Sequence, residues 1–186
     1  MRFNSMEHVE KFIRTGKFPS IHDDIFHAVS EVHEAFECAS DLGCCTGLLS
    51  QRLISAGIAR SVIGVEPNAA YLQHAVRNAR ITYLNYGLSR ATVDDFISRV
   101  ITNRVELIVA RRVFPEISET SGVDFVRELS SLFHRYGVRY IAVEGRKQVQ
   151  NPKNKLYSIE REIECFENSF ETLLTYNNCV ILKRKG

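Results

Sequence analysis

The chain has 186 residues, 45% hydrophobic and 25% charged, as expected of one folded domain of ordinary size. Twenty-four basic residues face 22 acidic ones, and the net charge of +2 excludes the strongly basic balance that by itself indicates a nucleic-acid-binding protein. Five cysteines without a CxxC pair make a poor disulfide framework, and no apolar run approaches a membrane span, so we expect a cytoplasmic protein with no membrane partner.

Two helices are expected before the first strand. Apolar residues recur at helical spacing over 6–13 and again over 25–36, on either side of a break at 18–20. We expect these helices to form an N-terminal cap, residues 1–34, on a single domain whose core spans 35–186.

From residue 36 onward, strands and helices alternate. Strands are predicted over 36–42, 61–66, 81–86, 105–110 and 138–143, and helices are marked by apolar residues within 48–54, 71–79, 96–101, 123–136 and 156–166. Asn177-Asn178, between extended runs at 170–176 and 179–182, predicts a hairpin because Asn tolerates positive φ. Since parallel neighbours need crossovers, the pattern predicts an α/β fold: a doubly wound, mostly parallel seven-stranded sheet with helices on both faces and an antiparallel last strand.

The turn after the first strand, Asp41-Leu42-Gly43-Cys44-Cys45-Thr46-Gly47, has the composition of a ligand-binding loop. Ligands of doubly wound sheets bind beyond the carboxyl ends of the strands. Gly43 can take the backbone angles of a tight turn, Gly47 permits close packing, and N–H groups at the start of the next helix favour a carboxylate or phosphate. The turn lacks the G-x-G-x-x-G pattern of dinucleotide-binding proteins.

Two acidic residues narrow the ligand class. Glu66 ends the second predicted strand, where its carboxylate can accept both hydroxyls of a ribose. Asp41 at the head of the turn would repel a pyrophosphate but suits the cationic amino group of a methionyl moiety. A nucleoside joined to an amino acid is therefore the better ligand.

The segments DLGCCTGLLSQRL and VIGVEPN resemble the first two motifs of the class I S-adenosylmethionine-dependent methyltransferases. The resemblance covers about residues 36–184, including the reversed final strand. It implies S-adenosylmethionine as cofactor and a binding set in which Asp41, Gly43, Cys45 and Gly47 surround the methionyl part, Glu66 holds the ribose, Pro67 and Asn68 flank the adenine, and Gly87 and Leu88 close its pocket. Cys44 and Leu48 complete the expected set. Cys45 stands where the family usually has another Gly, so its side chain must point away from the ligand or narrow the site.

The residues after the fourth strand, ARRVFPE, disfavour three classes of methyl acceptor. They lack the Asp/Asn-Pro-Pro-aromatic motif of amino-methylating DNA enzymes. No Pro-Cys pair exists for cytosine C5 methylation, and no Asp stands near Arg111 as RNA ribose methylation requires.

Basic residues predict an anionic acceptor instead. Arg111, Arg112, Arg146 and Lys147 are expected to line one rim of the site, with Phe114 as a stacking surface. A nucleic acid or a nucleotide is favoured, a carboxylate or phosphorylated metabolite suits the same rim, and exposed loop charges are the alternative interpretation. Glu144 is a candidate base or a partner of Arg146.

Three further expectations concern the rest of the chain. His22, His27 and His33 belong to the leading helices, which in this family often cover the cofactor, but each is predicted to be a surface or packing residue. No Cys/His/Asp cluster has ligand spacing, so no metal site is expected. The rival hypothesis is a non-catalytic domain that keeps the fold as a nucleotide-binding or partner-binding module.

Overall fold

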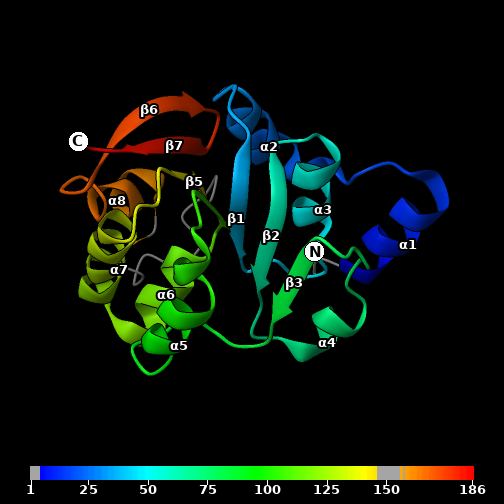
Figure 1. Ribbon diagram of the computed structural model, residues 1–186, viewed down its shortest axis with the longest axis horizontal. Coiled ribbons are helices and arrows are strands. Elements are labelled where there is room, and N and C mark those ends of the chain that lie inside the picture. Colours follow the sequence, from blue (N-terminus) through cyan, green and yellow to red (C-terminus); the bar gives the residue numbers. More distant parts are fainter. Residues whose placement is uncertain (1–4, 146–155, 157) are drawn as a thin grey trace.

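The computed structural model describes residues 5–145, 156 and 158–186, and within them seven strands form one sheet in the order β3-β2-β1-β4-β5-β7-β6 (Figure 1). The strands are β1 (Phe36–Leu42), β2 (Ala59–Val65), β3 (Ile81–Leu84), β4 (Leu107–Arg111), β5 (Tyr140–Glu144), β6 (Phe170–Tyr176) and β7 (Cys179–Arg184). The first five are parallel, and β7 lies antiparallel between β5 and β6. The predicted fold class is confirmed, including the hairpin at Asn177, whose φ is 52°.

The direction of winding reverses between β1 and β4. Strand β1 pairs with β2 on one side and with β4 on the other, with Leu42 opposite Ala110. The turn after β1 therefore lies next to Arg111, the last residue of β4. This switch point is where doubly wound sheets bind ligands.

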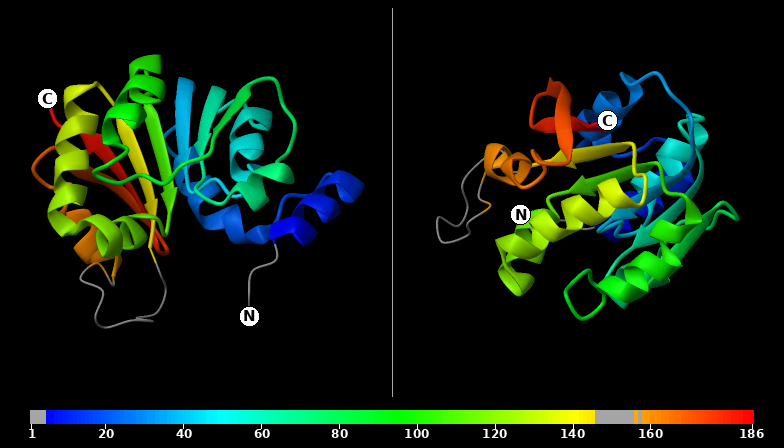
Figure 2. Two further views of the ribbon diagram at one scale, coloured as in Figure 1. Left: turned by 90° about the horizontal axis from the view of Figure 1, so that it is seen from below. Right: turned by 60° about the vertical axis from the view of Figure 1, so that its left-hand side comes forward.

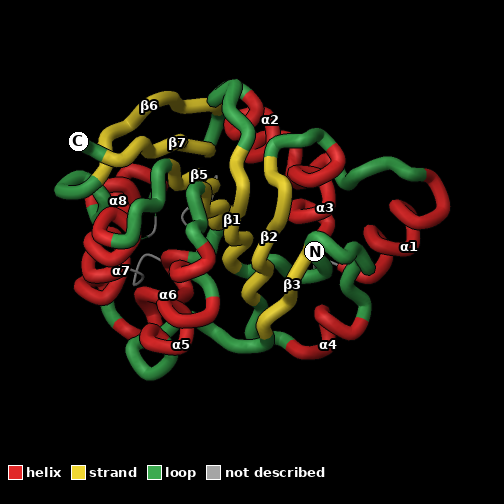
Figure 3. The backbone as a smooth tube through the Cα atoms, in the orientation of Figure 1, coloured by secondary structure: helices red, strands yellow, loops and turns green. Residues whose placement is uncertain are grey.

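Helices cover both faces of the sheet (Figures 2 and 3). One face packs against α5 (Val93–Arg99), α6 (Phe114–Ser121), α7 (Val123–Arg135) and the region of α8 (Ile159–Glu164). The other packs against α1 (Ser5–Thr15), α2 (Asp23–Ser30) and α3 (Leu48–Ser55). Single 3-10 turns, η1 (Ser20–His22) and η2 (Ile101–Asn103), follow α1 and α5. Within the described part of the chain, no helix is both long enough and apolar enough to cross a membrane.

The largest departures from the sequence prediction concern two helices, although α2 also ends earlier than the predicted residue 36. Helix α4 (Ala69–Gln73) stops well before residue 79, because the Val76 N–H donates to the carbonyl of Thr46 and the Val76 carbonyl accepts from the Tyr83 hydroxyl. Helix α6 was not expected at all. It begins at Phe114 and carries Pro115 in its first turn, where a missing N–H costs nothing.

Candidate cofactor site

The turn after β1 depends on glycine at two positions. Gly43 and Gly47 have φ values of 68° and 71°, in the left-handed region that favours glycine. A Cβ at Gly43 would lie 2.8 Å from Cγ2 of Val113, and one at Gly47 would lie 2.0 Å from the Tyr83 hydroxyl. Both glycines are thus required by the packing of the turn against the protein itself.

Cys45 adopts the same left-handed conformation without being glycine, with a φ of 50°. This backbone costs an ordinary residue about 1–2 kcal/mol. The Cys45 N–H donates to Oε2 of Glu66 at 2.9 Å, a charge-assisted bond that offsets part of the cost. Cys45 therefore stands at a position whose backbone conformation favours glycine.

Glu66 links the two sequence motifs. It directly follows β2, is only 5% exposed, and accepts one N–H on each carboxylate oxygen, from Cys45 and from Asn68 at 2.8 Å. The Asn85 side chain donates to the Glu66 carbonyl. A carboxylate oxygen can accept more than one hydrogen bond, so the fixed Glu66 side chain retains acceptor capacity for a ligand hydroxyl.

Asp41 lies at the bottom of the site, 2% exposed, and accepts a 2.6 Å hydrogen bond from the Ser50 hydroxyl of α3. Burial raises the pKa of Asp41 to about 7; the Ser50 hydrogen bond opposes this rise and the Glu66 charge adds to it. The Asp41 carboxylate has lost its hydration on burial, and hydrogen bonding from Ser50 offsets only part of that loss. A cationic group beside it would therefore stabilise its charged form.

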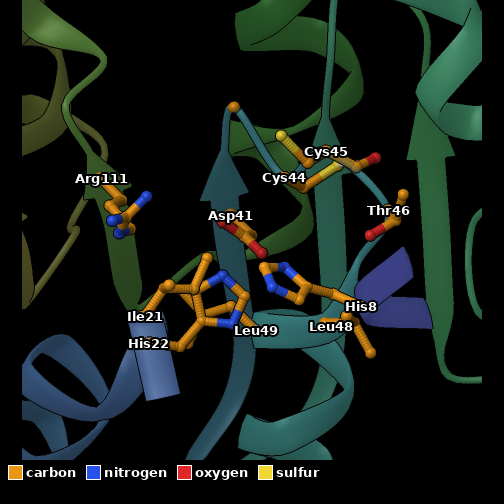
Figure 4. Close-up of a pocket in the computed structure, with 11 residues that line it drawn as sticks. His8, Ile21, His22, Asp41, Cys44, Cys45, Thr46, Leu48, Leu49 and Arg111 are labelled. Carbon is orange, nitrogen blue, oxygen red and sulfur yellow. Dashed lines mark hydrogen bonds between the residues drawn. The ribbon is translucent and has the colours of Figure 1, made fainter. Parts of the chain in front are cut away.

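A cavity of about 100 Å³ lies over Asp41 (Figure 4). Its walls come from the turn after β1, from the start of α3 and from Arg111. The remaining wall is formed by three residues of the N-terminal segment, His8, Ile21 and His22.

Burial lowers the pKa of His22 to about 3, and the charge of Arg111 adds to the effect, so this imidazole is neutral at physiological pH.

The basic rim of the site is organised around Glu144. This buried carboxylate, at the end of β5, has Oε1 2.9 Å from Nε of Arg111 and 3.6 Å from Nη2 of Arg112. Burial raises the pKa of Glu144, and the two guanidinium groups oppose the rise. Two arginines thus lie within ion-pair distance of one buried carboxylate at this rim. The other rim residues, Arg146 and Lys147, lie outside the described residues.

Comparison with solved structures shows which known proteins share this fold. No family model and no curated protein matches the sequence. Among solved structures, WbdD, a bifunctional kinase-methyltransferase, superposes with a TM-score of 0.64 at 14% identity over 88% of this chain and 39% of WbdD. Magnesium protoporphyrin IX methyltransferase from Synechocystis PCC 6803, with bound S-adenosylmethionine, gives 0.57 at 15% identity over 98% and 86%. A protein from Staphylococcus aureus, proposed to be a caffeoyl-CoA O-methyltransferase, gives 0.59 at 12% identity over 100% and 94%. The chain has the class I methyltransferase fold.

The chain spans about two fifths of WbdD, against most of the length of the other two proteins. The turn after β1 and Glu66 after β2 lie at the carboxyl ends of adjacent strands, and cofactor binding by these residues stays a prediction. Pro67 and Asn68 are exposed beside them, and a Cβ on Gly87 would lie 3.4 Å from Cβ of Pro67. The predicted adenine-binding residues therefore lie close together, except that the Leu88 side chain is buried in the core.

Phe114 corrects one prediction about the acceptor side. Its ring is 0% exposed and lies 4.9 Å from that of Phe166, edge to face, so it cannot stack on an acceptor. The reason is helix α6, which starts at Phe114 and turns this side chain into the core. Glu144 pairs with Arg111 and Arg112. Arg146, its expected partner, lies outside the described residues, so that pairing stays a prediction.

We expect Phe114→Ala to lower the free energy of unfolding by about 3–5 kcal/mol, since the truncation leaves a cavity in a packed core. Urea unfolding measures this, with the exposed Tyr136→Ala as the control that changes stability by about 0.5 kcal/mol or less. Wild-type stability in Phe114→Ala would contradict the core placement.

The sequence did not indicate His8 and Ile21 as residues of the site, and it predicted His22 to be a surface or packing residue. Helical spacing marked α1 as amphipathic but gave no indication of which part of the sheet it would cover. His27 and His33 are exposed, as expected, and lie near Glu31.

Proposed function

We propose that this chain binds S-adenosylmethionine and transfers its methyl group to an acceptor that carries an anionic group. The observation that carries the proposal is the buried Asp41 carboxylate in the turn after β1, next to the fixed carboxylate of Glu66. The cofactor has an ammonium group, a sulfonium centre and a vicinal diol. These groups match a buried carboxylate and a second carboxylate with free acceptor capacity.

The residues present fit this cofactor chemically. Asp41 would hold the ammonium group, Glu66 the ribose hydroxyls, and the exposed Pro67-Asn68 segment would flank the adenine. The cofactor supplies an electrophilic methyl group on its sulfonium. The task of the protein is then to hold the acceptor in line with that methyl group, which provides much of the rate enhancement without a base.

The acceptor side supports an anion. Arg111 lines the cavity, and Arg112, with a side chain 39% exposed, shares Glu144 with it. A nucleotide, a nucleic-acid strand or a carboxylate metabolite carries suitable charge. With Phe114 in the core, charge rather than base stacking is the basis of the proposal.

A non-catalytic partner-binding module is the second candidate, and one observation favours it over any module that binds a nucleotide or the cofactor. The cavity of about 100 Å³ is smaller than the roughly 300 Å³ or more of typical small-molecule pockets. Calorimetry with S-adenosylmethionine and its demethylated product separates the candidates, because a folded protein that binds neither compound is not this enzyme. If binding is found, transfer of radiolabelled methyl to pooled DNA, RNA, protein and small-molecule fractions identifies the acceptor class.

We expect Arg112→Ala to weaken the acceptor identified in that assay by about tenfold or more, through loss of a charge-assisted hydrogen bond, while cofactor affinity stays unchanged. The acceptor KM and cofactor calorimetry report the two effects separately. Arg60→Ala, an exposed arginine at the start of β2, is the matched control. Unchanged acceptor kinetics in Arg112→Ala would remove Arg112 from the acceptor site.

A further inference from the structure

The two halves of the N-terminal cap are attached to the protein with unequal strength. Among residues 6–15 of α1, only Val9 is buried; Phe12 is half-buried, with its ring 4.6 Å from that of Phe18. Ile13 on the same helix is 74% exposed. Helix α2, by contrast, buries three residues and packs against β5, β6 and β7. Helix α1 is therefore the part of the cap that can move at least cost.

A glycine lies between the halves, where its N–H donates to the carbonyl of Phe12 and ends α1. Gly16 follows α1 with a φ of 66°, and a Cβ there would meet no atom within 4 Å. Beyond it, Arg52 of α3 holds the chain, with Nη1 2.6 Å from Oδ1 of Asp23 and its guanidinium 4.0 Å from the centre of the Phe26 ring. Rotation about Gly16 would thus displace α1 and leave α2 in place.

His8 projects from α1 into the cavity. In Figure 4 its imidazole lies beside Asp41, on the same side as Leu48. This is the position that the proposed function gives to the ammonium end of the cofactor. With His8 present, the space left over Asp41 is about 100 Å³. This cavity is smaller than the roughly 300 Å³ or more of typical small-molecule pockets, so a cofactor with its ammonium group at Asp41 would require His8 to move.

We propose that α1 is a gate on the cofactor site: His8 occupies the methionyl end when the gate is closed, and the cofactor enters after α1 rotates away about Gly16. The inference rests on the proposed function, because the gate has a role only if a ligand binds at Asp41. It differs from a cover that closes over bound ligand, since here the cap fills the site before the ligand arrives.

Stopped-flow fluorescence with the demethylated cofactor product tests the gate. The chain has no tryptophan, so all variants carry the reporter substitution Ile13→Trp on the exposed face of α1. We expect the observed binding rate of the reporter protein to level off at high ligand concentration, because gate opening becomes limiting. Val9→Ala, which loosens α1 without touching the cavity, should raise that limiting rate on the order of tenfold. His8→Ala should strengthen the apparent affinity, since closed protein no longer competes with ligand.

Lys11→Ala, at an exposed position of the same helix, is the control and should behave like the reporter protein. Circular dichroism establishes that each variant is folded. A rate that rises linearly with ligand concentration and is equal in all variants would overturn the gate while leaving the proposed function intact. Absence of binding by every variant, including His8→Ala and Val9→Ala, would overturn both.

Discussion

Asp41→Asn is expected to stabilise the cofactor-free protein at pH 8 while weakening cofactor binding by tenfold or more. A rise in pKa from 3.8 to about 7 corresponds to roughly 4 kcal/mol of unfavourable free energy in the folded state. Because the pKa is raised on folding, this cost is absent below about pH 4, grows up to about pH 7 and is constant above. The uncharged amide avoids it and can still accept the Ser50 hydrogen bond.

Urea unfolding at pH 8 and at pH 4.5 measures this effect. The advantage of Asp41→Asn should be several kcal/mol at pH 8 and small at pH 4.5. Asp95→Asn, at an exposed position of α5, is the control and should change stability little at either pH. Equal stability of wild type and Asp41→Asn at both pH values would show that Asp41 carries no buried charge.

The ionisation of Asp41 also predicts how cofactor affinity depends on pH. A cation beside Asp41 favours the ionised carboxylate, so affinity for S-adenosylmethionine should increase from pH 6 to pH 8 as Asp41 loses its proton. Asp41→Asn should lose this dependence along with tenfold or more of the affinity. Calorimetry across the pH range tests both statements.

Glu66→Ala should have the other large effect, a loss of tenfold or more in affinity for both the cofactor and its demethylated product. Hydrogen bonds from ligand hydroxyls to a carboxylate contribute about 1.5–3 kcal/mol each. The structure adds a second expectation. The N–H groups of Cys45 and Asn68 lose their acceptor, so Glu66→Ala should also cost about 1–3 kcal/mol of stability for each group left buried.

Glu66→Gln separates the two effects, because its amide keeps one oxygen acceptor for the turn but cannot accept on both sides. It should retain more stability than Glu66→Ala while still losing cofactor affinity. Glu37→Gln, exposed on β1 and paired with Arg60, is the matched control. Full cofactor affinity in Glu66→Gln and Glu66→Ala would mean that the ribose is held elsewhere.

Local sequence signals were sufficient for the sheet and for the turn after β1. An acidic residue followed by small residues defines a turn whose angles depend on a few neighbouring positions, and Gly43 and Gly47 have the positive φ that the pattern requires. The hairpin at Asn177 was predictable for the same reason. A turn whose conformation depends on a few neighbouring residues can be predicted from the sequence without knowledge of the rest of the fold.

The errors arose where distant contacts decide local structure. Helix α4 is short because Val76 bonds to Thr46, thirty residues earlier, and no pattern in the sequence near Val76 indicates this. The cavity wall at His8 depends on how α1 docks. Helix α6 is different: Pro115 followed by Glu116 is a recognisable helix start, and treating this stretch as an acceptor loop hid both the helix and the burial of Phe114.

Strand β7 has a consequence for the order of events during synthesis. It pairs with β5 on one side and β6 on the other, although β6 is made first. Until β7 is available, β5 presents an open sheet edge and β6 has no strand partner among the described residues. Such an edge can pair with other chains. The nascent protein is thus most exposed to misassembly after β6 has left the ribosome and before the Asn177 turn has closed, and chaperones that cover strand edges would act in that interval.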